Sequence, residues 1–287
     1  MNNTLEKAKR VDREKIVKRI RGAYKSGYQS LVLRRSARQR LLFILGCQRS
    51  GTTLMTELFE HDVRVKVYGE YSKLSSRDPN GLRLNPLPEV AQTLAQDRAS
   101  LIVMKPLVET QNALALLAQF PHAKILWMYR DYRDVARSKL KKSGMHNGIR
   151  DMLYIVEQRP HWRAENVSEE VRGLVRKHYS PSMNPYDGAA LYWYVRNSFL
   201  FEQNLAQHPA VYICRYESFV EDPVRHLREI YDFVDLPAPD LTIPEVHASS
   251  VGKGAQVELS AAVAALCDEM TARLDSVWMR QNEGKAN

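Results

Sequence analysis

The chain has little cysteine and no long apolar segment. Its 287 residues include three cysteines (Cys47, Cys214 and Cys267), an odd number without the spacing of a metal site. This usage favours a reducing compartment over a disulfide scaffold. No apolar run approaches the roughly 18 residues that a membrane-spanning helix needs, and the polar N-terminus lacks the apolar core of a secretory signal. These absences favour a cytoplasmic protein.

Acidic residues are scarce in the first 40 residues, where 13 Lys/Arg face 3 Asp/Glu. This segment therefore has a net charge of +10. The whole chain has a net charge of +9, so the net charge of the other 247 residues is −1. Leu5, Ile16, Ile20 and Tyr24 are near helical spacing, which predicts an amphipathic helix over 5–24 within a basic helical arm at 1–40. The arm is either a solubilising segment or a contact for an acidic partner: an anionic glycan, a carrier protein or a membrane surface. No motif for specific nucleic-acid binding accompanies its charge.

The segment 41–60 (LLFILGCQRSGTTLMTELFE) combines an apolar run, a turn and a helical pattern. Gly46 and Gly51 are spaced as in a phosphate-binding P-loop, in which backbone N–H groups and the helix dipole attract an anion. NTPases have a lysine where this chain has Thr52, so ordinary ATP or GTP chemistry is disfavoured. Arg49 is the cation of the loop instead. The pattern therefore predicts a site for a phosphate-like group, without a metal.

Apolar runs and helical patterns alternate along the chain. Strands are predicted at 41–45, 63–67, 101–104, 124–129 and 211–214. Helices are predicted from 52 onward and at 90–96, 111–120, 133–142, 188–207 (with Asp187 as N-cap), 223–234 and 260–278. This order predicts an α/β fold: a P-loop-like, mostly parallel sheet flanked by helices.

The alternation breaks in two places. Residues 72–90 are rich in turn formers and are predicted to be a loop. Residues 143–187 contain short helical pieces at 149–158 and 168–178, which predicts a helical cap inserted into a domain spanning 41–280. The last residues, 281–287, are a predicted polar tail.

The loop at 47–54 (CQRSGTTL) resembles the 5′-phosphosulfate loop of sulfotransferases, with Gln48 where that family commonly has proline. The resemblance implies a donor, 3′-phosphoadenosine 5′-phosphosulfate (PAPS), and no metal. The implied donor-binding residues in this loop are Arg49, Ser50, Gly51, Thr52 and Thr53.

A second stretch, 127–138 (WMYRDYRDVARS), resembles the 3′-phosphate motif of the same family. Arg130 and Ser138 stand at its two phosphate-binding positions. Arginine offers a planar fork to a dianion, and a serine hydroxyl adds a further donor. Weaker likenesses imply that Tyr216 and Lys253 also approach the nucleotide.

Charged residues follow the predicted strands, and ligands of parallel sheets bind outside the carboxyl ends of strands. Lys105 resembles the catalytic lysine of the family. The histidine base of the cytosolic hormone and phenol enzymes is absent, because Leu107 stands in its place. Glu70 follows the second strand, as does the base of tyrosylprotein and some bacterial sulfotransferases. Glu70 is therefore the predicted general base, with Lys105 and Arg49 as stabilisers of the leaving group.

The resemblance predicts transfer of a sulfuryl group to an acceptor hydroxyl on a sugar, a natural product or a tyrosine. Two alternatives stay open. One is a P-loop kinase-like phosphotransferase, which the missing loop lysine opposes. The other is a non-enzymatic module that binds an acidic partner through the basic arm.

Overall fold

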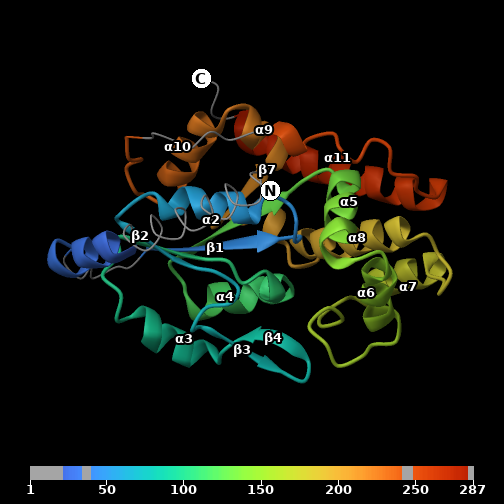
Figure 1. Ribbon diagram of the computed structural model, residues 1–287, viewed down its shortest axis with the longest axis horizontal. Coiled ribbons are helices and arrows are strands. Elements are labelled where there is room, and N and C mark those ends of the chain that lie inside the picture. Colours follow the sequence, from blue (N-terminus) through green and yellow to red (C-terminus); the bar gives the residue numbers. More distant parts are fainter. Residues whose placement is uncertain (1–21, 34–39, 241–247, 284–287) are drawn as a thin grey trace, which may run out of the picture.

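The protein is built around one five-stranded parallel sheet (Figure 1). The computed structural model describes residues 22–33, 40–240 and 248–283. The strand order across the sheet is β2-β5-β1-β6-β7, with the P-loop strand in the centre. The strands are β1 (Arg40–Gly46), β2 (Val65–Tyr68), β5 (Leu101–Met104), β6 (Ala123–Tyr129) and β7 (Val211–Arg215).

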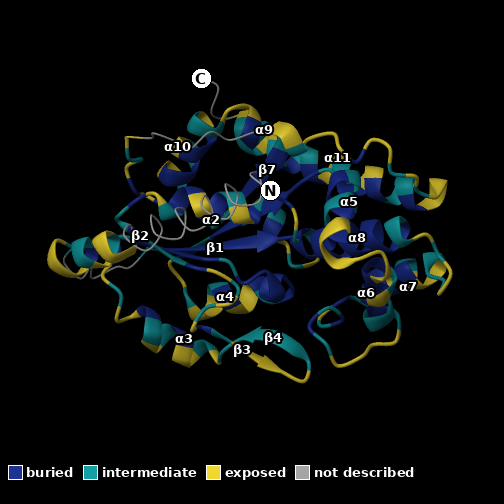
Figure 2. Cartoon of the chain, in the orientation of Figure 1, coloured by how far each residue is buried: buried dark blue, intermediate teal, exposed yellow. Residues whose placement is uncertain are grey.

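The central strand supplies both cores, because successive side chains of a strand point to opposite faces. Phe43 and Leu45 belong to one apolar cluster, whereas Leu42 and Ile44 belong to the other. Helices cover both faces, so the strands are buried (Figure 2). The second cluster is covered by α2 (Thr52–Glu60), α9 (Tyr216–Glu221) and α10 (Pro223–Phe233). The first is covered by α3 (Leu87–Leu94), α4 (Ala113–Gln119), α5 (Tyr132–Ser143), α8 (Pro185–Glu202) and α11 (Ala261–Glu283).

The α/β fold and all five predicted strands are confirmed, but the predicted long helix is wrong at both ends. The helix α8 begins at Pro185, and its N-cap is Asn184, whose side chain accepts a hydrogen bond from the Tyr186 N–H at 3.0 Å. Asp187 instead accepts a bond from the Ser260 N–H at 2.9 Å. The helix ends at Glu202, because the chain then adopts a left-handed conformation at Asn204 (φ 53°).

The predicted loop at 72–90 contains a small antiparallel hairpin, β3 (Ser75–Asp78) and β4 (Gly81–Leu84), and the start of α3. Its first strand is polar and does not alternate with apolar residues, so the local pattern carried no strand signal. A distant carboxylate holds the hairpin: Glu109 accepts bonds from the Arg83 side chain at 2.9 Å and from the Leu84 N–H at 3.1 Å.

Other elements differ from the prediction in their ends. The predicted helix at 111–120 is a 3₁₀ turn η1 (Leu107–Asn112) followed by α4, and α11 continues to Glu283, into the predicted tail. The predicted cap at 143–187 contains α6 (His146–Val156) and α7 (Glu169–His178). Two further 3₁₀ turns are η2 (Leu205–Gln207) and η3 (Ala248–Ser250).

The described part of the N-terminal arm is helical over 22–31. The Gln29 side-chain amide donates to the Val63 carbonyl at 2.9 Å and to the Val65 carbonyl at 3.1 Å, so this helix covers the start of the edge strand β2. Most of the helix predicted at 5–24 lies outside the described residues. Among the described helices, none is long and apolar enough to cross a membrane.

Candidate active site

The P-loop lies at the carboxyl end of β1, between this strand and α2. Gly46 has φ 116°, and a Cβ there would lie 2.3 Å from the Met128 carbonyl oxygen, so the loop can leave the sheet only through glycine. Ser50 is fully buried, and its Oγ has no hydrogen-bond partner among the described residues. A buried hydroxyl without a partner costs free energy unless a ligand satisfies it.

Gly51 is the N-cap of α2 and has φ 88°, in the left-handed region. A Cβ at this position would lie 2.2 Å from the Tyr216 ring. The aromatic ring therefore packs directly against the loop.

We expect Gly51→Ala to destabilise the fold by about 1–3 kcal/mol, because it adds both backbone strain and a clash with the Tyr216 ring. Thermal unfolding measures this loss. Gly173→Ala is the matched control, since a Cβ at Gly173 on α7 meets no atom within 4 Å. That control should be neutral or stabilising. Equal stability of the two variants would contradict the packing of Tyr216 on the loop.

The two predicted phosphate motifs meet at the same edge of the sheet. Arg49 Nε donates a hydrogen bond to Ser138 Oγ at 3.0 Å, although these residues lie on different motifs 89 positions apart. Arg49 reaches this position from a left-handed backbone conformation (φ 74°). The loop cation and the hydroxyl on α5 therefore face one space.

Arg130 is buried at the carboxyl end of β6. Its Nη2 donates to Asp134 Oδ2 at 2.9 Å and to the Ser250 carbonyl oxygen, and its guanidinium lies 4.3 Å from the centre of the Tyr216 ring. Its Nε is buried and has no hydrogen-bond partner in the described part of the chain. Arg130 thus retains a donor that its protein contacts leave unused.

Asp134 joins the late glycine-rich loop to this site, a role that the sequence reasoning did not assign. Its carboxylate accepts bonds from the Gly252 N–H at 2.9 Å and the Gly254 N–H at 2.5 Å. The exposed Lys253 between them is thereby held beside the Arg130 motif. The loop also contacts Tyr216, whose hydroxyl lies 2.7 Å from Ser250 Oγ.

Lys105 follows β5 and reaches the P-loop helix. Its Nζ donates to Thr53 Oγ1 at 3.1 Å, and its backbone N–H donates to the Tyr68 carbonyl at 2.9 Å, next to the end of β2. Burial raises the pKa of the Glu70 carboxyl above its ordinary value, and the charges of Lys105 and Arg196 oppose this shift. A carboxylate that is partly desolvated near a cation suits proton transfer.

Arg196 was missed by sequence reasoning, because it lies within the aromatic-rich helix α8 and belongs to no motif. It is fully buried. Its guanidinium donates to Gln111 Oε1 at 3.0 Å and to the Leu107 carbonyl at 2.7 Å. The charge of Arg196 also lowers the pKa of Glu70, so this buried residue contributes to the electrostatics of the site.

A buried ion cluster connects α5 with the segment 143–187. Asp151 on α6 is fully buried and pairs with Lys139 Nζ at 2.5 Å and with Arg163 Nε at 2.8 Å. The Lys139 ammonium lies 3.5 Å from the centre of the Tyr192 ring, and the Tyr192 hydroxyl donates to Gln48 Oε1 at 3.0 Å. This chain of contacts runs from the P-loop to the predicted cap.

Within the described residues there is no group of three or more His, Cys, Asp or Glu that could hold a metal ion.

Comparison with known proteins identifies the family of this chain. The family model described as a sulfotransferase domain matches residues 39–253. A sulfotransferase from Alicyclobacillus acidocaldarius has a similar fold, with a TM-score of 0.51 and 16% sequence identity over 85% of this chain and 97% of that chain. The sulfotransferase domain from the curacin biosynthetic pathway also has a similar fold, with a TM-score of 0.52 and 15% sequence identity over 84% of this chain and 99% of that chain. The curated proteins give no match. Because the family match spans most of its length, the chain belongs to the sulfotransferase family and is an enzyme of sulfuryl transfer.

Proposed function

We propose that the enzyme moves the sulfuryl group of PAPS to an acceptor hydroxyl on a sugar, a natural product or a tyrosine, with Glu70 as general base. The observation that carries this proposal is the 3.0 Å bond between Arg49 and Ser138. It joins the loop expected to bind the 5′-phosphosulfate to the motif expected to bind the 3′-phosphate. A single nucleotide with phosphates at both ends would span these motifs.

The polar groups of the site fit such a donor. Ser50 Oγ and Arg130 Nε are buried without partners among the described residues, and each can donate to an anionic oxygen. The N-terminus of α2, with Gly51, Thr52 and Thr53, would hold the 5′ side through backbone N–H groups. Arg130 and Ser138 would hold the 3′-phosphate. Tyr216 and Lys253 would flank the nucleotide.

In the proposed reaction the oxygen of the acceptor hydroxyl forms a bond to sulfur, while Glu70 accepts the proton of that hydroxyl. The bond from sulfur to the bridging phosphate oxygen breaks, which leaves a sulfated acceptor and 3′-phosphoadenosine 5′-phosphate (PAP). Lys105 and Arg49 stabilise the negative charge that grows on the bridging oxygen. One such stabiliser is worth on the order of 3 kcal/mol in the barrier. The segment 143–187 would hold the acceptor.

The test is calorimetric titration with PAP, with ATP and 5′-AMP for comparison. We expect PAP to bind more tightly than 5′-AMP. Arg130→Ala should weaken PAP binding by roughly 10- to 100-fold, because a charged donor worth about 1.5–3 kcal/mol is lost.

Arg133→Ala is the matched control. Arg133 lies three residues further along, and its guanidinium pairs with Asp268 at 3.5 Å, away from Asp134. PAP affinity should be unchanged in this variant. Equal affinity of the wild type for PAP and 5′-AMP would contradict the 3′-phosphate role of Arg130 and Ser138. Preferential binding of ATP would favour the kinase-like alternative.

A further inference from the structure

The described helix of the arm leaves apolar side chains in solvent. Tyr24 is 66% exposed, Leu31 88% and Val32 58%. Tyr24 and Leu31 are seven residues apart, so two helical turns place them on one face. The helix contacts the domain through Lys25 and Gln29 instead. The side chains of Tyr24, Leu31 and Val32 therefore face away from the domain.

This apolar surface belongs to the most basic part of the chain. Residues 1–40 carry a charge of +10, whereas the other 247 residues sum to −1. Most of these basic residues belong to 1–21 and 34–39, and the described helix itself contributes Lys25. Exposed aromatic and aliphatic side chains within a segment of such basic sequence are typical of proteins that bind an anionic membrane surface. Each basic residue near such a surface adds attraction that salt screens.

The arm helix lies at the end of the sheet opposite the active site. Gln29 contacts the start of β2, and Arg98, which precedes β5, donates to the Ser30 carbonyl at 2.6 Å. In Figure 1 this helix, in blue, lies at the left end of the molecule, while the P-loop end of β1 points to the right. A surface bound to the helix would leave the active site open.

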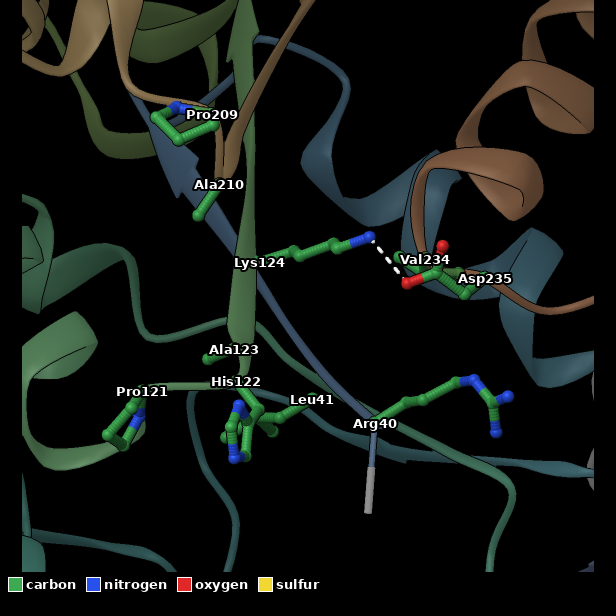
Figure 3. Close-up of a pocket in the computed structure, with 10 residues that line it drawn as sticks. All are labelled: Arg40, Leu41, Pro121, His122, Ala123, Lys124, Pro209, Ala210, Val234 and Asp235. Atoms are coloured by element: carbon green, nitrogen blue, oxygen red, sulfur yellow. Dashed lines mark hydrogen bonds and ion pairs between the residues drawn. The ribbon is translucent and has the colours of Figure 1, made fainter. Parts of the chain in front are cut away.

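A basic cavity opens at the same end of the sheet. It has a volume of about 530 Å³ and lies at the amino ends of β1, β6 and β7 (Figure 3). The side chains of Arg40 and Lys124 extend beside it, and Lys124 Nζ pairs with Asp235 at 2.7 Å. The Arg40 guanidinium adds positive charge at the end where the arm helix is docked.

We propose that the arm binds this enzyme peripherally to an anionic lipid surface, with Tyr24, Leu31 and Val32 inserted among the headgroups. A lipid surface satisfies both features of the arm, its charge and its exposed apolar side chains. An anionic glycan would leave the apolar side chains in water. A second copy of the chain offers little opposite charge, because the domain outside the arm is close to neutral.

The test is co-sedimentation of the full chain with vesicles of phosphatidylcholine alone or mixed with phosphatidylserine. We expect binding to the mixed vesicles that falls as salt is raised, and little binding to phosphatidylcholine. The double variant Leu31→Ser/Val32→Ser should bind the mixed vesicles about tenfold more weakly, because two apolar side chains no longer insert. PAP affinity and activity should be unchanged in this variant.

Leu114→Ser on α4 is the matched control, since Leu114 is an exposed leucine (46%) outside the arm. It should bind as the wild type does. Absence of wild-type binding to the mixed vesicles, or equal binding by the double variant, would overturn the proposal. Binding to soluble polyglutamate without vesicle binding would assign the arm to an acidic protein instead. Self-association lost in the double variant, without vesicle binding, would assign it to a second copy.

Discussion

Glu70→Gln is expected to lower kcat by about 10²- to 10⁴-fold, the range that general-base catalysis supplies. The substitution keeps the size of the side chain and removes its ability to accept a proton. The measurement is transfer from radiolabelled PAPS to the acceptor that the wild type uses best in a panel of sugars and phenols. PAP affinity should be unchanged, because Glu70 is not among the residues proposed to hold the nucleotide. An unchanged kcat would exclude Glu70 as the base.

The same variant has a defined effect on the pH profile. Burial raises the pKa of Glu70 in the folded protein, and a base acts only when ionised. For the wild type, kcat/KM should therefore fall with decreasing pH through a value above the ordinary pKa of a glutamate. This decrease at low pH, the acid limb of the kcat/KM profile, should be absent from the residual activity of Glu70→Gln.

Stability distinguishes a catalytic role of Glu70 from a structural one. A carboxyl whose pKa is raised by folding binds its proton more tightly in the folded state, so its ionisation lowers stability as the pH rises past the unfolded value. Glu70→Gln should consequently unfold at the same temperature as the wild type, or higher, at neutral pH. Glu89→Gln, on the exposed first turn of α3, is the matched control: it should leave activity unchanged and cost at most about 1 kcal/mol of stability, because it removes a carboxylate near a helix N-terminus. A large loss of stability in Glu70→Gln would indicate a structural carboxylate.

The phosphate loop and the sheet could be predicted because their signals are local. Five apolar residues, two glycines and two threonines lie within residues 41–53, a stretch that forms a strand, a loop and the start of a helix. The strand ends then follow from topology. This is why the sheet edge that carries Glu70, Lys105 and Arg130 could be anticipated before any contact was known.

Contacts between distant segments could not be predicted in this way. Asp134 holds the loop at 252–254 through backbone N–H groups, which leave no trace in side-chain identity. Arg196 looks like any polar residue within an aromatic helix until its carbonyl partner at Leu107 is known. The hairpin at 75–84 depends on Glu109, which follows it by 25 residues or more. In each case a polar contact between distant segments stabilises the arrangement, and neither residue propensities nor hydrophobic periodicity indicate that contact.

Lys105→Ala is expected to lower kcat by about 10²- to 10³-fold, as removal of one donor to a developing oxyanion does. Its ammonium lies 3.1 Å from Thr53 Oγ1, at the helix start where the leaving phosphate is proposed to bind. The affinity for PAPS should fall much less than kcat, since the bridging oxygen of the intact donor lacks the charge that grows in the transition state. Steady-state kinetics and titration with PAPS in the absence of an acceptor measure the two effects separately.

The same variant should also move the pH profile. The charge of Lys105 lowers the pKa of Glu70, so its removal should shift the acid limb of kcat/KM to higher pH. Lys142→Ala, an exposed lysine in the last turn of α5, is the matched control and should shift neither kcat nor the limb. An unshifted limb in Lys105→Ala would mean that Glu70 does not titrate in the profile. A shift to lower pH would contradict the coupling of the two groups. A lower kcat together with a shift of the acid limb to higher pH would indicate that Lys105 and Glu70 act in the same reaction centre.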